Sequence, residues 1–245
     1  MVEPLVVPAG SAQFGFVNAP RTLFKFFAQE AHARALVESG QVRIGTLYEF
    51  RAIEGWDSVR GDAAEGQFTF TLESSAPETI TVENAPWYLK PILEELGMPI
   101  LSHGGTINAV GSHPDAYIFC TTAVRTSGAV GAYGRYCVEI HEVVGFFTAL
   151  TRHLTDVLGM VAREPHGFLG SCLYLERGVK VTASSTEVVE PPLSFIKQPD
   201  KQHEQEVRAI WHPTGSVTAT VTVCPELARF CSLVSGDDLR DKGAA

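Results

Sequence analysis

The chain has 245 residues, 45% of them hydrophobic and 19% charged, enough to bury a substantial core in one large domain or in a domain with an elaboration. Its net charge of −9 disfavours nucleic acid or an anionic membrane as a general partner, although a local basic groove is compatible with it. No apolar run approaches the roughly 18 residues that span a bilayer, so we expect no membrane contact. Five cysteines without a CxxC pair, most of them in apolar runs, indicate buried reduced thiols in a cytoplasmic protein and disfavour a zinc site.

The chain begins with a strand–helix–strand pattern. Residues 1–20 are rich in Pro, Gly and Ala, and we expect them to form a flexible leader. A strand over 21–27 (RTLFKFF) leads into a helix over 28–39, for which Gly40 is a C-terminal stop signal. A second strand over 41–50 follows directly, so the connections are short.

Residues 51–114 break this pattern and form a candidate insertion. Residues 51–66 are polar and glycine-rich with charges of both signs, which predicts either a functional, mobile loop or a self-neutralising surface loop. Alternating apolar and polar residues over 67–73 and 78–83 predict the two strands of a hairpin.

The second half of the chain again carries clear elements. Strands are predicted over 116–123 (AYIFCTTA) and 135–140 (RYCVEI), followed by a helix over 141–158 with apolar residues at helical spacing. A hairpin is predicted within 171–183, with Arg177-Gly178 as its turn.

A late strand beginning at Glu204 is the most informative stretch. Alternation predicts that Glu204, Glu206 and Arg208 share one face while the apolar residues between them face a core. The two carboxylates would then lie about 7 Å apart, because the rise is ~3.3 Å per residue. Such a pair is either a solvated face with a Glu–Arg pairing or a catalytic edge. A strand over 216–224 is expected to pair with 206–211.

These elements predict an α+β fold of mainly antiparallel strands with two or three packed helices. We expect one domain over 21–234, with 51–114 as its candidate insertion, and a flexible tail over 235–245. The sequence contains no GxGxxG opening a helix, no GxxxxGK[ST], no HExxH and no GxSxG. Hydride transfer, P-loop hydrolysis and zincin chemistry therefore lack sequence support.

Three segments taken together resemble the ADP-ribosyltransferase fold. They are a cation on the first strand (Lys25 in LFKFF), a strand ending in Cys120-Thr121-Thr122, and a late Glu204-Gln205-Glu206. Residues 21–212 also resemble a broad, poorly characterised family of bacterial domains with a Tyr-Lys-Tyr-like first strand and a late Glu-x-Glu-Arg strand. The resemblance implies a split sheet and an NAD-dependent transferase, such as a toxin or defence effector, that modifies a protein or nucleic acid.

The resemblance also implies roles for single residues. Glu206 would be the catalytic glutamate that binds the nicotinamide-ribose hydroxyl and stabilises an oxocarbenium-like transition state. Glu204 would orient the acceptor or assist its deprotonation.

The implied cofactor-binding residues lie in three other segments. Thr121 and Thr122 would brace the nicotinamide pocket, and Lys25 would contact the phosphate or ribose of NAD. Tyr133 or Tyr136 would supply a stacking surface for the nicotinamide ring.

The chain departs from the family pattern in three ways. Lys25 stands where arginine is usual and lacks its bidentate fork, Cys120 replaces a serine, and the long spacing between them requires an insertion. Two other readings stay open. One is a non-catalytic nucleotide- or partner-binding module of the same fold. The other is a metal-dependent nuclease whose acidic residues hold Mg²⁺, namely Asp57, Asp62, Glu65, Glu204 and Glu206.

Overall fold

The structure is a computed structural model, and the chain divides into two compact units. The residues described are 14–17, 20–53, 66–81, 83, 97–125, 134–158, 167–174, 178–182, 193–213 and 215–234. The first unit comprises 1–65, 114–172 and 200–245, and the second comprises 66–113 and 173–199. This division differs from the prediction of one domain over 21–234, because 173–199 joins most of the candidate insertion in a unit of its own.

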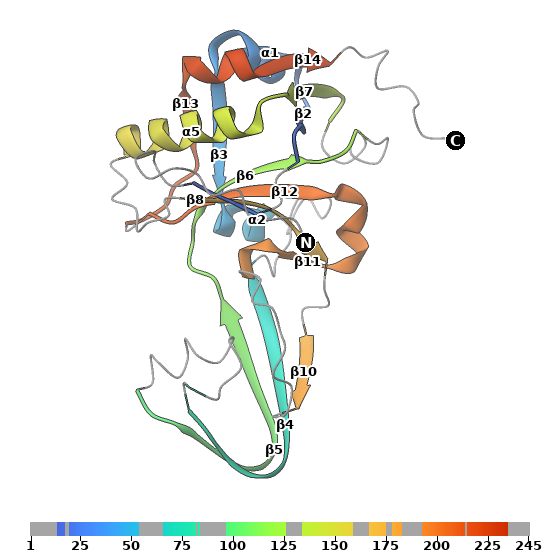
Figure 1. The fold of residues 1–245 in the computed structure, drawn as a ribbon, viewed down its shortest axis with the longest axis vertical. Coiled ribbons are helices and arrows are strands. Elements are labelled where there is room, and N and C mark those ends of the chain that lie inside the picture. The colour runs from blue at the N-terminus through green and yellow to red at the C-terminus, as the bar shows by residue number, and fades with distance from the viewer. Residues whose placement is uncertain are drawn as a thin grey trace, which may run out of the picture. The chain divides into compact units, whose positions relative to one another are not determined.

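The first unit is built on a nine-stranded, mainly antiparallel sheet with helices packed on it, an α+β architecture (Figure 1). Its strands are β1 (Phe14–Val17), β2 (Leu23–Phe27), β3 (Gln41–Thr46), β6 (Tyr117–Thr122), β7 (Tyr136–Ile140), β8 (Gly167–Ser171), β12 (Glu206–Trp211), β13 (Thr220–Val223) and β14 (Cys231–Val234). The pairing order runs β1-β8-β12-β6-β2-β7-β14, and β3 with its neighbour β13 also joins β6. The strands predicted near 21–27, 116–123 and 135–140 are thus confirmed.

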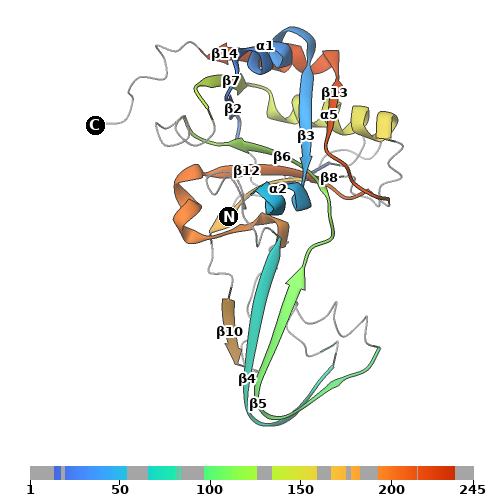
Figure 2. The same ribbon diagram turned by 180° about the vertical axis from the view of Figure 1, so that it is seen from behind.

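Strand β6 is where this sheet divides. One edge of β6 pairs with β12 along its whole length. The other edge pairs with β3 at Tyr117 and Ile118 and with β2 at Thr122 alone. In both views β2 and β6 run in clearly different directions (Figures 1 and 2). Within the described residues, the edge of β6 around Cys120 therefore faces a fork between two strands instead of a strand.

The core lies between the sheet and helix α5 (Val143–Leu158), which confirms the helix predicted over 141–158. Apolar residues of α5 at helical spacing pack against β6 and β12, with Phe119 and Trp211 on the facing strands. Trp211 is completely buried, and its Nε1 donates a hydrogen bond to Oγ1 of Thr151 at 2.9 Å. Helix α1 (Glu30–Ser39) and the 3-10 helix η3 (Pro225–Phe230) pack on each other and on the β14 side of the sheet.

The strand predicted over 41–50 is wrong after Thr46, where helix α2 (Leu47–Ile53) begins. Oγ1 of Thr46 accepts the Glu49 N–H at 3.1 Å. Oδ1 of Asp115, from the segment that leads into β6, accepts the Tyr48 N–H at 2.9 Å. These two side chains satisfy amides at the helix start, and one of them comes from a distant part of the chain, so local alternation could not reveal the boundary.

Two further predictions about the first unit are wrong. The expected flexible leader includes β1, which pairs parallel to β8. Strand β13 pairs with β3 and not with 206–211, because both edges of β12 are already occupied by β6 and β8. The predicted tail over 235–245 lies outside the described residues.

The second unit is a three-stranded sheet of β4 (Gln67–Ile80), β5 (Ile100–Ser112) and β10 (Gly178–Thr182), with a short pair β9 (Leu173–Tyr174) and β11 (Ile196–Lys197) and the 3-10 helix η1 (Leu193–Phe195). The predicted hairpin over 67–83 is wrong, because β4 is one strand whose register shifts between Ser74 and Pro77. The predicted hairpin within 171–183 is also wrong, since β9 pairs with β11 and β10 with β4. No helix within the described ranges has the length and apolarity that a membrane crossing requires.

Candidate functional site

The late Glu-x-Glu does not lie on one strand face. Glu204 ends the 3-10 helix η2 (Pro199–Glu204), and β12 starts at Glu206. Between them Gln205 adopts φ +42°, a left-handed conformation that is uncommon for a residue other than glycine. The prediction of a strand from Glu204 with both carboxylates side by side on one face is therefore wrong.

The end of β6 holds this junction in place. Oγ1 of Thr122 donates to the carbonyl oxygen of Glu204 at 2.7 Å, and the N–H of Ala123 donates to the carbonyl of Gln205 at 3.1 Å. On the other side, the N–H of Cys172 donates to the carbonyl of Glu206 at 2.9 Å. The backbone that carries the Glu206 side chain is thus fixed from two neighbouring strands.

Glu206 and Arg208 form a buried ion pair on the sheet face opposite α5. Nε of Arg208 donates to Oε1 of Glu206, and these residues are 2% and 5% exposed. Every residue of β12 is buried, because the strand is central in the sheet. The interpretation of a solvated strand face with a Glu–Arg pairing is therefore wrong, because both side chains are buried.

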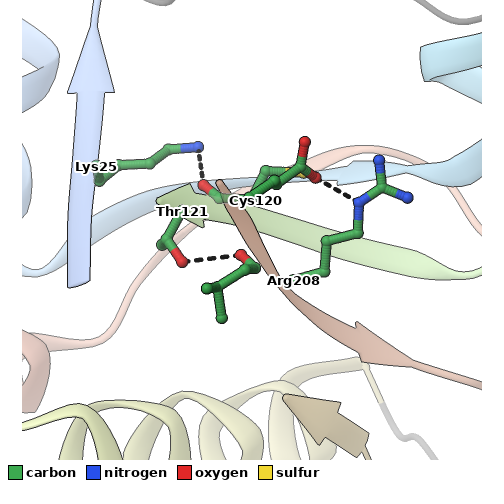
Figure 3. Close-up of polar contacts among 6 residues, drawn as sticks. Lys25, Cys120, Thr121 and Arg208 are labelled. Atoms are coloured by element: carbon green, nitrogen blue, oxygen red, sulfur yellow. Dashed lines mark hydrogen bonds and ion pairs between the residues drawn. The ribbon is translucent and has the colours of Figure 1, made fainter. Parts of the chain in front are cut away.

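The side chain of Lys25, which belongs to β2, reaches from that strand to the edge of β6 at Cys120. Its Nζ donates to the carbonyl oxygen of Cys120 at 2.7 Å and lies 4.7 Å from the centre of the Phe119 ring. In Figure 3, Lys25 and Arg208 approach Cys120 from opposite sides. Burial lowers the pKa of Lys25, although the Glu206 carboxylate counteracts this by stabilising the ammonium. The lysine thus supplies to the Cys120 carbonyl the hydrogen bond that a neighbouring strand would otherwise donate.

The two threonines that follow Cys120 align neighbouring strands. Oγ1 of Thr121 donates to the carbonyl oxygen of Val207 at 2.8 Å (Figure 3). Oγ1 of Thr122 donates to Glu204 as described, and it accepts the Val124 N–H at 3.2 Å. Because each hydroxyl hydrogen is already bound by a carbonyl of the chain, these threonines position β12 and its glutamate.

A hollow opens at the fork. It is lined by Phe24, Lys25, Phe26, Cys120, Thr121, Thr122 and Glu206, and its open space is about 310 Å³ including the mouth. Most of that space is open to solvent, and the cavity itself is about 50 Å³, well below the ~300–1,000 Å³ of typical ligand pockets, so it would take only part of a ligand, with the rest in the open mouth. Of the seven residues to which the resemblance gives a catalytic or cofactor-binding role, four converge here: Lys25, Thr121, Thr122 and Glu206.

The other three residues with such a role, Glu204, Tyr136 and Tyr133, are not among the described residues that line this hollow. Glu204 is 2% exposed within η2 and does not line it. Tyr136 packs against the core of the first unit, with the Arg135 guanidinium 5.4 Å from its ring centre. Tyr133 lies outside the described residues.

Three residues were missed by sequence reasoning. Phe24 and Phe26 supply the aromatic lining that the sequence analysis assigned to the tyrosines. The alternation in LFKFF places them on one face of β2, and that signal was available. Arg208 was recognised only as a surface partner, because its burial depends on the strands on both sides of it.

The described residues do not support a metal site. No group of three or more His, Cys, Asp or Glu side chains that could hold a metal occurs among them. Glu206 is instead paired with a guanidinium. Of the acidic residues weighed for Mg²⁺, Asp57, Asp62 and Glu65 lie outside the described part of the chain.

The cysteine at the hollow is not an activated nucleophile. Burial raises the pKa of the Cys120 thiol, and the nearby Glu206 carboxylate raises it further. Burial also raises the pKa of Cys137 and of Cys231 to about 12. Thiolate, the nucleophilic form, is therefore scarce at these positions at neutral pH.

We expect the native protein to react slowly with a thiol reagent such as dithionitrobenzoate at pH 8. All five cysteines are free, and only Cys120 is more than marginally exposed. Counting released thiolate over time, with and without denaturing guanidinium chloride, measures this. The denatured chain should release five equivalents at once. Rapid release of one equivalent from the native protein would contradict the burial described for these thiols.

Comparison with known proteins adds no relationship: no protein-family model, no curated protein and no solved structure matches this chain.

Proposed function

We propose that the hollow at the fork binds the nicotinamide-ribose end of NAD and that the protein is an ADP-ribosyltransferase-like enzyme acting on a protein or nucleic acid. One observation carries the proposal. Lys25, Thr121, Thr122 and Glu206, separated by up to 181 residues in the sequence (206 − 25), line a single hollow. The division of the sheet at β6 is consistent with the split sheet that the resemblance implies.

The chemistry of the hollow suits cleavage of an N-glycosidic bond. As the bond between ribose C1′ and the nicotinamide nitrogen breaks, nicotinamide leaves with the bonding electron pair and C1′ gains positive charge. The Glu206 carboxylate would stabilise that charge, and its effect is strengthened by burial. The acceptor then forms a bond to C1′ through a lone pair, and its proton is released to water. Phe24 and Phe26 offer apolar surfaces against which the nicotinamide ring would pack.

The Arg208 guanidinium has two opposite consequences for this role. It holds the Glu206 carboxylate in one orientation, which favours catalysis. It also neutralises part of the charge that would stabilise the transition state. This second consequence favours the alternative of a non-catalytic module of the same fold that binds a nucleotide or a partner. A thermal shift with NAD that persists in Glu206→Gln, without turnover in either protein, would select the alternative.

Transfer from NAD is tested with Glu206→Gln. With labelled NAD and cell extract, we expect wild type to label a macromolecule and to release nicotinamide. Loss of one charge-stabilising group costs roughly 10²–10³-fold in rate, so Glu206→Gln should fall by about that factor. Glu38→Gln makes the same chemical change on α1, where the side chain is 64% exposed, and should keep full activity.

The folding of each variant is checked by circular dichroism, because Glu206→Gln leaves Arg208 without its carboxylate. Glu206→Asp keeps the charge but withdraws it by one methylene, and it should also lose most activity. Equal labelling by wild type and a folded Glu206→Gln contradicts the proposal. Absence of both labelling and nicotinamide release in wild type does so as well.

A further inference from the structure

A dinucleotide carries a diphosphate, and the cations around the hollow are nearly all engaged. Nζ of Lys25 is bound to the Cys120 carbonyl and lies over the Phe119 ring. Arg208 is buried against Glu206, and the exposed Arg43 of β3 forms an ion pair with Glu49. The net charge of −9 repels a dianion at long range, so binding requires a local cation that is not already neutralised.

Arg125 meets this requirement. It follows the end of β6 by three residues and is exposed, with its guanidinium carbon 5.4 Å from the ring centre of Phe24, which lines the hollow. The hydrogen bond from the Val124 N–H to Oγ1 of Thr122 fixes the backbone immediately before it. Within the part of the chain that the structure describes, Arg125 has no carboxylate partner.

The contact with the Phe24 ring does not occupy the hydrogen-bond donors of the guanidinium. A cation near an aromatic ring is attracted by the π system and not through its N–H groups, which stay available to a ligand. Arginine binds phosphate oxygens through two parallel hydrogen bonds, whereas Lys25 binds only as a point charge and already uses one of its three N–H donors on the Cys120 carbonyl.

We infer that Arg125 binds the diphosphate of a dinucleotide whose nicotinamide-ribose end occupies the hollow. This inference rests on the proposed function and reassigns the phosphate contact from Lys25 to Arg125. Arg125 would then set the preference for a dinucleotide over a nucleoside without phosphate.

Calorimetric titration of Arg125→Met tests this assignment with three probes: NAD, nicotinamide riboside and inorganic pyrophosphate. Loss of charge-assisted hydrogen bonds should weaken binding of NAD and of pyrophosphate roughly 10- to 100-fold. Nicotinamide riboside has no phosphate, so its affinity for Arg125→Met should stay within about twofold of its affinity for wild type. Loss of a hydrogen bond would change the affinity by more than that.

Arg135→Met is a matched control. Arg135 is also exposed, and its guanidinium carbon also lies 5.4 Å from an aromatic ring centre, that of Tyr136, which does not line the hollow. It should leave all three affinities unchanged. Equal weakening by both variants, or unchanged NAD affinity in Arg125→Met, would overturn the inference and leave the proposed function standing.

The remaining outcomes separate the two proposals. Wild type that binds pyrophosphate through Arg125 but neither NAD nor nicotinamide riboside would retain an anion site and refute the proposed function. Wild type that binds none of the three probes would overturn both.

Discussion

Replacing Glu206 by Gln should lower the free energy of unfolding by about 3–5 kcal/mol, because it removes the carboxylate that pairs with a buried guanidinium. Arg208 is 2% exposed, so water cannot solvate the charge that Glu206 now neutralises. Arg208→Met should cost a similar amount for the converse reason, since the buried Glu206 carboxylate would lose the guanidinium that pairs with it. Urea denaturation followed by circular dichroism measures both changes.

The double variant Glu206→Gln/Arg208→Met distinguishes an ion pair from two independent contributions. The double variant buries neither charge. Its loss of unfolding free energy should therefore be well below the sum of the losses in the two single variants. The exposed pair Arg34–Glu30 on α1 is the control, with side chains 53% and 49% exposed. Its removal should change stability by less than about 1 kcal/mol. Additive losses at Glu206 and Arg208 would show that the two side chains do not depend on each other.

Gly40→Ala should destabilise the first unit by roughly 2–5 kcal/mol, which combines two costs. Gly40 has φ +70°, and the left-handed conformation costs an L-residue ~1–2 kcal/mol. A Cβ at this position would also lie 1.9 Å from the carbonyl oxygen of Cys224, so the backbone before η3 would have to move. Overpacking of this kind typically costs ~1–3 kcal/mol. Urea denaturation again provides the measurement.

Gly97→Ala separates the two costs. Gly97 has nearly the same φ, +65°, but an added Cβ would meet no atom within 4 Å. It should therefore show only the conformational part, about 1–2 kcal/mol or less. A Gly40→Ala variant that loses no more stability than Gly97→Ala would mean that the close approach of Cys224 does not constrain α1.

The elements of the candidate site could be predicted from the sequence because their signals are local. Short runs of aromatic and β-branched residues in LFKFF and YIFCTT indicate β2 and β6, and Gly40 marks the end of α1. Helical spacing of apolar residues indicates α5. Each signal depends on neighbours within a few residues, and none depends on how distant segments pair. The α+β class follows from the elements alone.

The placement of the carboxylates could not be predicted in this way. Alternation continues through Glu204 in the sequence, but the strand starts only at Glu206 because Thr122 and Ala123 bind the carbonyls of Glu204 and Gln205. Those donors come from more than 80 residues away, as the separation of 82 between Thr122 and Glu204 shows. The same is true of β4, where two apparent strands form one because its partner β5 continues past Pro77.

The amino-acid sequence by itself determined the secondary structure around the site and the residue types that could act there, since propensity and periodicity are properties of short segments. Tertiary structure alone decided that two strands would share one edge of β6, that Lys25 would bind the Cys120 carbonyl between them, and that Arg208 would be buried beside Glu206. The physical reason is that burial and strand pairing depend on which distant segments hydrogen-bond to the N–H and C=O groups of a strand. In β12 these segments are β6 on one edge and β8 on the other.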